Sequence, residues 1–196
     1  MRDNTKNKHN KELTEGLNKT KGYTLVELIV AVTIFAILVA APTGIFVSSL
    51  KGQNRALILR EITDNASYVA EYMSRSLRMA LKDDLDGVSC LSGDNVNYEL
   101  EDSNHRINFK DHNEQCHSFY LENGRIKEER GSEILFLTSD DLEVKQLEFR
   151  IYGENQDDDN QPRVTLSFEI EKRGVSNSPA VKLQTTVSQR NLDVLY

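Results

Sequence analysis

The sequence predicts an α+β protein in which a long N-terminal helix, with a membrane half and an amphipathic half, packs on an antiparallel β-sheet. Three observations predict this fold: residues 28–50 carry no formal charge, apolar residues recur at helical spacing after Lys51, and polar and apolar residues alternate through much of 88–196. The predicted divisions are a basic leader at 1–22, the membrane half of the helix at 23–50, its amphipathic half at 51–86, and a β-rich head domain at 87–196.

The leader is the basic part of an otherwise acidic chain. Within residues 1–22, six lysines and arginines stand against three acidic residues, so the leader has a formal charge of +3. The whole chain has a charge of −7, which leaves −10 for residues 23–196. Basic residues before an apolar span favour an N-terminus that stays in the cytoplasm. The acidic body argues against capture of nucleic acid by the whole surface.

The uncharged interval at 28–50 is long enough to cross a hydrocarbon core of about 30 Å as a helix. Pro42 falls inside it, where a proline removes a helical hydrogen bond and predicts a kink. An ordinary proline tolerated within a membrane helix is the alternative. Glu27 stands just before the interval, and a charged side chain at that depth is costly unless another group pairs with it.

Two simple kinds of segment also fit the leader and the span. A secretory signal peptide would place cleavage near Ala40, within Val39-Ala40-Ala41, and would release an exported binding module or enzyme. Such peptides are normally uncharged where Glu27 stands. A plain single-pass anchor accounts for the length and the hydropathy, but it gives no reason for Glu27 or for the preceding Gly22 and Tyr23.

One apolar stripe, with steps of three and four residues apart from its last adjacent pair, marks the amphipathic half of the helix. Charged residues such as Glu71, Arg75 and Arg78 fall off this stripe, so its apolar side is predicted to pack on the sheet. The acidic residues and Gly87 that follow Lys82 predict the end of the helix. The stripe consists of Leu59, Ile62, Ala66, Val69, Met73, Leu77, Ala80 and Leu81.

The tail is predicted to form antiparallel strands with one apolar face and one polar face. Asn123-Gly124 separates two alternating stretches, at 116–121 and 125–129, and such a dipeptide favours a tight hairpin. Further alternating stretches lie at 147–151, 164–170 and 183–187. The apolar stripe of the helix would cover the apolar face of this sheet.

Cys90 and Cys116 are the two cysteines of the chain, and both follow the apolar span. If they occupy an oxidising side of the membrane, they are predicted to form a disulfide. Two unrelated buried thiols are the alternative.

Four residues close in sequence are of the types that bind zinc: His105, His112, Cys116 and His117. Zinc needs side chains that converge, but Cys116 and His117 are adjacent and would point to opposite faces of a strand. A disulfide would also remove Cys116 as a ligand. No metal is therefore predicted at these residues.

The loop at 153–163 carries three consecutive aspartates, and Asp157 and Asp159 are its candidate calcium ligands. The loop lacks the glycine and the distal glutamate of an EF-hand, so a solvated hairpin loop is the preferred interpretation. No G-x-S-x-G, H-E-x-x-H or glycine-rich phosphate loop occurs in the sequence. The chain is therefore predicted to have no catalytic residues and no cofactor.

The heptapeptide Lys21-Gly22-Tyr23-Thr24-Leu25-Val26-Glu27 resembles the processing site of type IV prepilins and pseudopilins. That site has a basic residue, a glycine, an aromatic residue and Thr-Leu-x-Glu before a membrane-length apolar run. Tyr23 departs mildly from the commoner phenylalanine. The order of span, helix and β-rich tail is also that of the family. The end of the chain, with its Gln-Arg-Asn at 189–191, resembles J-type pseudopilins and PilW-type minor subunits.

The resemblance implies that a prepilin peptidase, which is also the methylase, cuts between Gly22 and Tyr23 and methylates the new amine of Tyr23. Glycine before the cut would let a protease approach the backbone closely. The resemblance further implies that Glu27 pairs with that amine on a neighbouring subunit. The alternative is that Glu27 reaches the lipid headgroups and pairs with no group.

The implied function is that of a non-enzymatic subunit of a type IV pilus, a type II secretion pseudopilus or a DNA-uptake apparatus, of the minor or initiating kind. Before assembly it would span the inner membrane once, with a cytoplasmic N-terminus and a periplasmic or extracellular head. The implied partners are the prepilin peptidase, other pilin or pseudopilin subunits, the inner-membrane assembly platform and the lipid bilayer. Nucleic acid is not an expected partner of this subunit.

Overall fold

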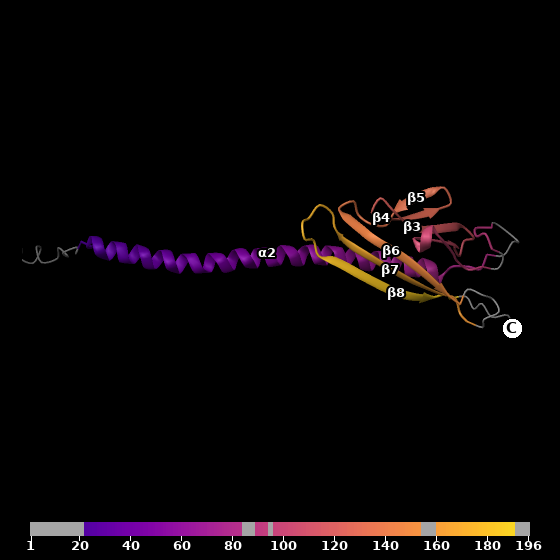
Figure 1. Ribbon diagram of the computed structural model, residues 1–196, viewed down its shortest axis with the longest axis horizontal. Coiled ribbons are helices and arrows are strands. Elements are labelled where there is room, and N and C mark those ends of the chain that lie inside the picture. Colours follow the sequence, from indigo (N-terminus) through magenta and orange to yellow (C-terminus); the bar gives the residue numbers. More distant parts are fainter. Residues whose placement is uncertain (1–21, 84–88, 94–95, 154–159, 191–196) are drawn as a thin grey trace, which may run out of the picture. The chain divides into compact units, whose positions relative to one another are not determined.

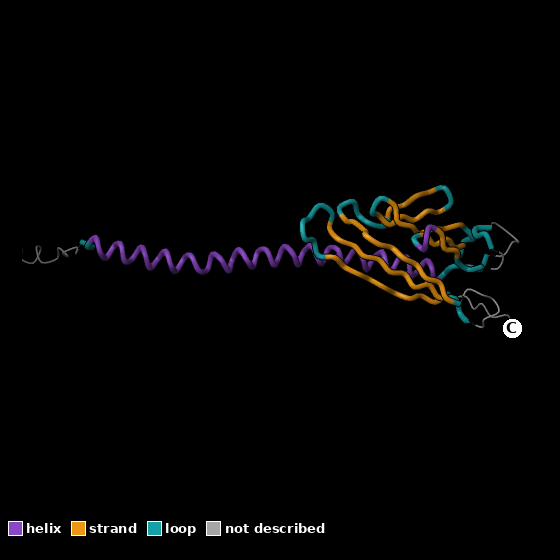
Figure 2. Tube along the Cα trace, in the orientation of Figure 1, coloured by secondary structure: helices purple, strands orange, loops and turns teal. Residues whose placement is uncertain are grey.

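The computed structural model describes residues 22–83, 89–93, 96–153 and 160–190. Within these ranges lie one long helix, a 3₁₀ turn and eight strands (Figures 1 and 2). The chain divides into two units, residues 1–50 and 51–196, and the long helix contributes to both. The elements are α2 (Leu25–Arg78), β1 (Glu99–Glu101), the 3₁₀ turn η1 (Asp102–Asn104), β2 (Arg106–Lys110), β3 (Cys116–Glu122), β4 (Arg125–Arg130), β5 (Glu133–Phe136), β6 (Leu142–Tyr152), β7 (Arg163–Lys172) and β8 (Ala180–Ser188).

Helix α2 begins at Leu25, immediately after Thr24. The hydroxyl oxygen of Thr24 accepts a hydrogen bond from the backbone N–H of Glu27 at 3.2 Å, and its carbonyl accepts one from Leu28 at 3.1 Å. Thr24 is therefore the N-cap of the helix. The run Thr-Leu-Val-Glu also has the spacing of a capping box, with Glu27 at its third helical position.

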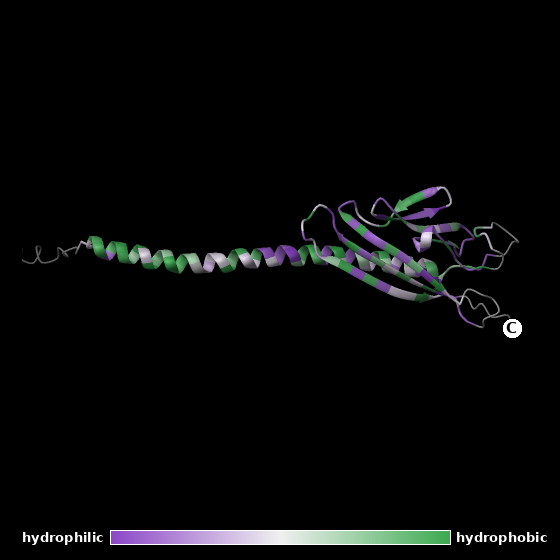
Figure 3. Cartoon of the chain, in the orientation of Figure 1, coloured by the Kyte–Doolittle hydropathy of each residue, from purple (hydrophilic) through white to green (hydrophobic). Residues whose placement is uncertain are grey.

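The first half of α2 is a helix of membrane-spanning length and composition (Figure 3). Its most apolar window has a mean hydropathy of 2.5, and none of that window is buried within the chain. The hydroxyls of Thr33 and Thr43 donate to the carbonyls of Ile29 and Val39. These polar side chains are thus satisfied by the helix itself, as a lipid environment requires.

Pro42 lies inside α2, and the helix continues through it. Because proline has no N–H, the carbonyl of Leu38 cannot receive its usual helical hydrogen bond from this position. The kink at Pro42 stays a prediction.

The second half of α2 buries most of the predicted stripe: Ile62, Met73 and Leu77 are fully buried, as are Ala66 and Val69. Leu59 is an exception, because it is 42% exposed. Ile58 packs against the core in its place. At about 100° per residue, Ile58 lies on the same helical face as Ile62, four residues later.

The helix ends at Arg78, earlier than the predicted end after Lys82. The following residues form isolated β-bridges instead of continuing the helix: the N–H of Leu81 donates to the carbonyl of Lys110 at 2.8 Å, and that of Asp83 donates to the carbonyl of Val96 at 2.9 Å. Asp83 was predicted to terminate the helix, and it forms an isolated β-bridge beyond the helix end.

Groups distant in sequence cap the carbonyl end of α2. The hydroxyl of Tyr98 donates to the carbonyl of Leu77 at 2.7 Å, and the N–H of Arg190 donates to that of Arg78 at 2.8 Å. The side-chain amide of Gln189 donates to the carbonyl of Ala80 at 2.8 Å. Tyr98 and Arg190 thus satisfy carbonyls that a helix end otherwise leaves without partners, and Gln189 holds the segment that follows the helix.

The strands are antiparallel, as predicted, and they form two sheets. One sheet has the order β1-β2-β3-β4-β5 and the other the order β6-β7-β8. The N–H of Val144 on β6 donates to the carbonyl of Gly124 in the turn between β3 and β4, at 2.9 Å, and so links the two sheets. Alternation in the sequence identifies the faces of strands but not the hydrogen-bonding partner of each strand, so the division into two sheets is not visible in it.

The hairpin of β3 and β4 is confirmed, with Asn123 and Gly124 at its turn. Both residues have positive φ, 53° and 72°, which this tight turn requires. The register pairs His117 with Arg130 and Phe119 with Glu128. Because alternate residues share a face, these four side chains lie on the same side of the sheet.

One apolar core joins the second half of α2 to both sheets. Figure 1 shows β6, β7 and β8 beside this half of the helix. The core therefore holds the helix end and the two sheets as one folded head. Its largest fully buried side chains are Tyr98, Phe109, Phe119, Phe149, Ile62, Met73, Leu77, Ile107, Ile126, Leu142, Leu147 and Leu166.

Candidate functional site

The predicted processing residues, Gly22 and Tyr23, precede α2 and are exposed. A Cβ atom added to Gly22 would meet no atom within 4 Å. The packing of the described residues therefore gives no reason for a glycine at this position.

Glu27 lies in the first turn of α2 and is exposed. A carboxylate in this place is favoured by the partial positive charge of the helix N-terminus and by the capping-box spacing with Thr24. The position of Glu27 is therefore suited to a local helical role as well as to the pairing predicted from the resemblance. The two roles differ in what they require: an amide side chain satisfies the capping box, and only a carboxylate forms an ion pair.

The predicted disulfide between Cys90 and Cys116 is confirmed, with an S–S distance of 2.07 Å. It ties the segment at 89–93 to the first residue of β3. This segment also caps a buried ion pair, because the N–H groups of Cys90 and Leu91 donate to Oδ2 of Asp83 at 2.7 and 2.8 Å. Oδ1 of Asp83 lies 3.4 Å from Nζ of Lys110, and both side chains are buried.

Replacing both cysteines by serine should destabilise the head by about 3 kcal/mol, since the bond closes a long loop and the unfolded chain would gain freedom without it. The loss should appear as a lower midpoint in urea denaturation followed by circular dichroism. A double change of the exposed Ser176 and Ser188 to alanine is the matched control and should leave the midpoint unchanged. Equal midpoints for the serine variant and the parent chain would contradict a stabilising role of the disulfide.

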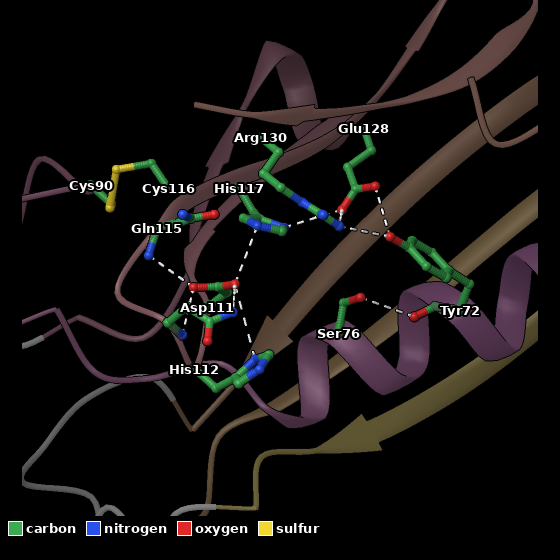
Figure 4. A network of polar contacts seen from close by, with 11 residues as sticks. Tyr72, Ser76, Cys90, Asp111, His112, Gln115, Cys116, His117, Glu128 and Arg130 are labelled. Atoms are coloured by element: carbon green, nitrogen blue, oxygen red, sulfur yellow. Dashed lines mark hydrogen bonds and ion pairs between the residues drawn. A yellow bond between two sulfur atoms is a disulfide. The ribbon is translucent and has the colours of Figure 1, made fainter. Parts of the chain in front are cut away.

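A buried polar network lies between α2 and the beginning of β3 (Figure 4). Its centre is His117, which is 5% exposed. Nδ1 of His117 lies 3.1 Å from Oε1 of Glu128, and Nε2 lies 3.4 Å from Oδ2 of Asp111. Each ring nitrogen thus faces a carboxylate, so the imidazole is held between two acceptors.

Glu128, on β4, connects this network to the helix. Its Oε2 accepts a hydrogen bond from the hydroxyl of Tyr72 at 2.8 Å, and its Oε1 lies 3.3 Å from Nη2 of Arg130. The same Nη2 donates to the hydroxyl oxygen of Tyr72 at 3.1 Å. The side chains of His117, Tyr72 and Arg130 therefore converge on one buried carboxylate.

Burial alone would raise the pKa of Glu128, but the hydrogen bonds from His117 and Tyr72 and the charge of Arg130 outweigh burial and hold this pKa below its ordinary value. Burial, followed by the hydrogen bond and the charge of Glu128, raises the pKa of Tyr72 to about 12. Glu128 is therefore held as an anion, and the hydroxyl of Tyr72 keeps the proton that it donates.

Asp111 is fixed by its own turn. Its Oδ1 accepts hydrogen bonds from the backbone N–H groups of Asn113 and Gln115, both at 2.8 Å, and its Oδ2 accepts one from Nδ2 of Asn113 at 3.2 Å. Burial would raise the pKa of Asp111, but the backbone hydrogen bonds from Gln115 and Asn113 outweigh it and lower this pKa. Asp111 is therefore a second buried anion whose oxygens are already engaged.

The histidines and the cysteine considered for zinc are not brought together as a ligand set. Cys116 is in the disulfide, and Nδ1 of His105 contacts the carbonyl of Leu147 at 2.5 Å. Within the ranges that the structure describes, no group of three or more histidine, cysteine and acidic side chains is arranged to hold a metal ion. The calcium candidates Asp157 and Asp159 lie outside the described residues.

The sequence-based prediction missed the network around Glu128, although the sequence carries a signal for it. Ile126, Glu128 and Arg130 alternate along one strand, so Glu128 has the phase of the buried Ile126. A charged residue at a core-facing phase must have buried partners. The register set by the Asn123-Gly124 turn would have identified His117 and Arg130 as its neighbours.

The family model described as the prokaryotic N-terminal methylation motif matches residues 17–41. No curated protein and no solved structure matches the chain. The match includes the junction between Gly22 and Tyr23 and the first turns of α2.

The helix of membrane-spanning length, the antiparallel sheets and the disulfide define a membrane-anchored protein with an α+β head. With the methylation motif at the beginning of that helix, these features support a type IV pilin-like or pseudopilin-like protein. The motif implies processing by a prepilin peptidase and assembly with other pilins, as a structural subunit.

Proposed function

We propose that the chain is a non-enzymatic subunit of a type IV pilus or of a type II secretion-like pseudopilus, and that it is of the minor or initiating kind. One observation carries the proposal: the methylation motif covers both the exposed junction before Tyr23 and the capped beginning of a membrane-length helix. In this arrangement a single cut separates a basic leader from an apolar helix.

In the proposed sequence of events, a prepilin peptidase cuts between Gly22 and Tyr23 at the cytoplasmic face and methylates the amine of Tyr23. The helix then stays in the inner membrane until assembly. There Glu27 pairs with the amine of a neighbouring subunit, because a carboxylate in an apolar filament core needs a cation. The apolar side chains of α2, exposed within the single chain, would be covered by the helices of neighbouring subunits.

The head would lie in the periplasm or outside the cell. The disulfide between Cys90 and Cys116 supports this location, because such bonds persist in oxidising compartments. The basic leader supports a cytoplasmic N-terminus. Other pilin or pseudopilin subunits, the assembly platform and the lipid bilayer would be the partners.

An alternative is an exported binding module or enzyme that signal peptidase releases near Ala40. The continuity of α2 argues against it, because the helix runs from Leu25 to Arg78 and the cut would fall within it.

The N-terminus of the mature protein tests the proposal. Intact mass and N-terminal sequencing are expected to give a chain that begins at Tyr23 and carries one methyl group. Gly22→Leu should block the cut, whereas Gly52→Leu should not affect it; an added Cβ at either glycine meets no atom within 4 Å, which makes them a matched pair. A mature chain that begins near Ala41 would overturn the proposal.

A further inference from the structure

The head contains a cavity of about 400 Å³ between α2 and the turn that joins β2 to β3. A volume of this size is typical of pockets that hold small organic ligands. Among the described residues, the helix contributes Tyr68 and Tyr72 to its wall, and Met79 lines it just beyond the helix end. The rings of Tyr68 and Tyr72 are stacked, with centroids 6.2 Å apart. One side of the cavity is therefore aromatic and apolar.

The carboxylates deepest in this region are not available to a ligand. Asp111 lines the cavity, but its oxygens already accept hydrogen bonds from Asn113 and Gln115. Glu128, behind the wall, is fully buried, and its two oxygens face donors of other residues of the network. Glu71 is the accessible carboxylate of the described lining, and it is paired with Arg75 one helical turn away.

The cations of the wall have unused donors. Arg130 lines the cavity with a side chain that is 38% exposed, and Figure 4 shows its guanidinium between Glu128 and Tyr72. A guanidinium carries five N–H donors, and the contacts of Arg130 with Glu128 and Tyr72 both use Nη2. Arg75 pairs with Glu71 through Nη2 at an exposed site, where such a pair is weak and exchangeable.

We propose that this cavity binds a carboxylate carried on an aromatic or other flat apolar group, with Arg130 and Arg75 as the cationic partners of the carboxylate. The planar guanidinium matches a carboxylate in two parallel hydrogen bonds. The rings of Tyr68 and Tyr72 match the flat body of the ligand. This binding site is independent of the proposed assembly through the N-terminal helix.

The ion pair between Glu71 and Arg75 allows a test of whether the ligand is an anion or a cation. A carboxylate ligand must compete with Glu71 for Arg75, so Glu71→Gln should strengthen its binding and Arg75→Gln should weaken it. A cationic ligand would show the reverse order. An uncharged ligand held by the aromatic wall alone would respond to neither change.

Binding of 4-fluorobenzoate to the mature chain in detergent micelles, followed by ¹⁹F NMR line broadening, measures these effects. We expect saturable binding at concentrations near about 1 mM, weakened about tenfold by Arg75→Gln and strengthened by Glu71→Gln. Arg150→Gln is the matched control, since Arg150 is paired with Glu148 outside the cavity and is 73% exposed, against 74% for Arg75. It should leave binding unchanged.

Three outcomes would overturn the proposal: no saturable binding of 4-fluorobenzoate, equal binding of the uncharged 4-fluorobenzamide, or an equal loss in Arg75→Gln and Arg150→Gln. Arg130→Gln should also abolish binding, but it disturbs the network around Glu128 and can unfold the head. Ser76→Leu avoids that difficulty, because it fills the cavity from the helix and leaves the charged residues in place. It should abolish binding while the denaturation midpoint stays near that of the parent chain.

Discussion

Glu27→Gln is expected to leave the cut before Tyr23 intact and to prevent filament assembly. The amide keeps the capping-box geometry with Thr24, so the beginning of α2 should be preserved. It removes the charge, and an amine in an apolar filament core would then lack its counter-ion. Removing one partner of a buried ion pair costs about 3–5 kcal/mol, which is at least a hundredfold in the equilibrium for adding a subunit.

Filaments sheared from cells and quantified by immunoblot measure assembly, and the intact mass of the membrane-bound subunit measures cleavage. Glu27→Ala should give the same loss of filaments, because it removes the charge and the capping group together. Thr24→Ser keeps the cap and should assemble normally. Normal filaments from Glu27→Gln together with none from Glu27→Ala would assign Glu27 to the helix cap and rule out the ion pair.

Glu128→Ala should destabilise the head by about 3 kcal/mol, because it leaves the donors of His117, Tyr72 and Arg130 facing a buried void. This value is at the lower end of the range for buried ion pairs, since Arg130 is 38% exposed and water can reach it. Urea denaturation of the mature chain in micelles at pH 7 measures the loss. The control is Glu122→Ala, whose carboxylate lies in the same hairpin, is half exposed and pairs with Lys127. It should change stability by less than about 1 kcal/mol.

The same network predicts how stability depends on pH. The pKa values of Glu128 and Asp111 in the folded chain lie below their ordinary values of 4.5 and 3.8. Between the lowered and the ordinary pKa values, the folded state therefore binds fewer protons than the unfolded state. The two carboxylates thus stabilise the fold fully above their ordinary pKa values, and this stabilisation is lost as the pH falls through their lowered pKa values. Stability should decline below about pH 4.5. Glu128→Ala should flatten this decline, and an equally steep decline in the variant would show that Glu128 does not contribute to it.

Much of the fold follows from sequence periodicity. The apolar interval, the stripe from Ile62 to Leu77 and the Asn123-Gly124 hairpin are local patterns, and each has the predicted structure. The exceptions depend on distant residues. The helix ends at Arg78 because residues from three other parts of the chain take over its last carbonyls and the backbone that follows. No local pattern near Arg78 carries that information.

The candidate sites also differ in whether they depend on a local sequence pattern or on distant residues. Gly22, Tyr23 and Glu27 form a short motif, so the sequence alone identifies them. The network of Glu128 and His117 depends on strand register and on a helix 56 residues away from Glu128, at Tyr72. Register was predictable from the hairpin turn, but the approach of Tyr72 was not, because it results from the packing of α2 on the sheet.

The capping of α2 by Gln189 and Arg190 has a practical consequence for labelling the protein. A deletion that begins at Gln189 removes donors to the carbonyls of Ala80 and Arg78, so it should loosen the last turn of the helix and the segment that follows it. A tag at the N-terminus would leave with the leader under the proposed processing. The exposed turn between β7 and β8, where Gly174 and Asn177 have positive φ, is the better place for an inserted epitope, since its side chains take no part in the core.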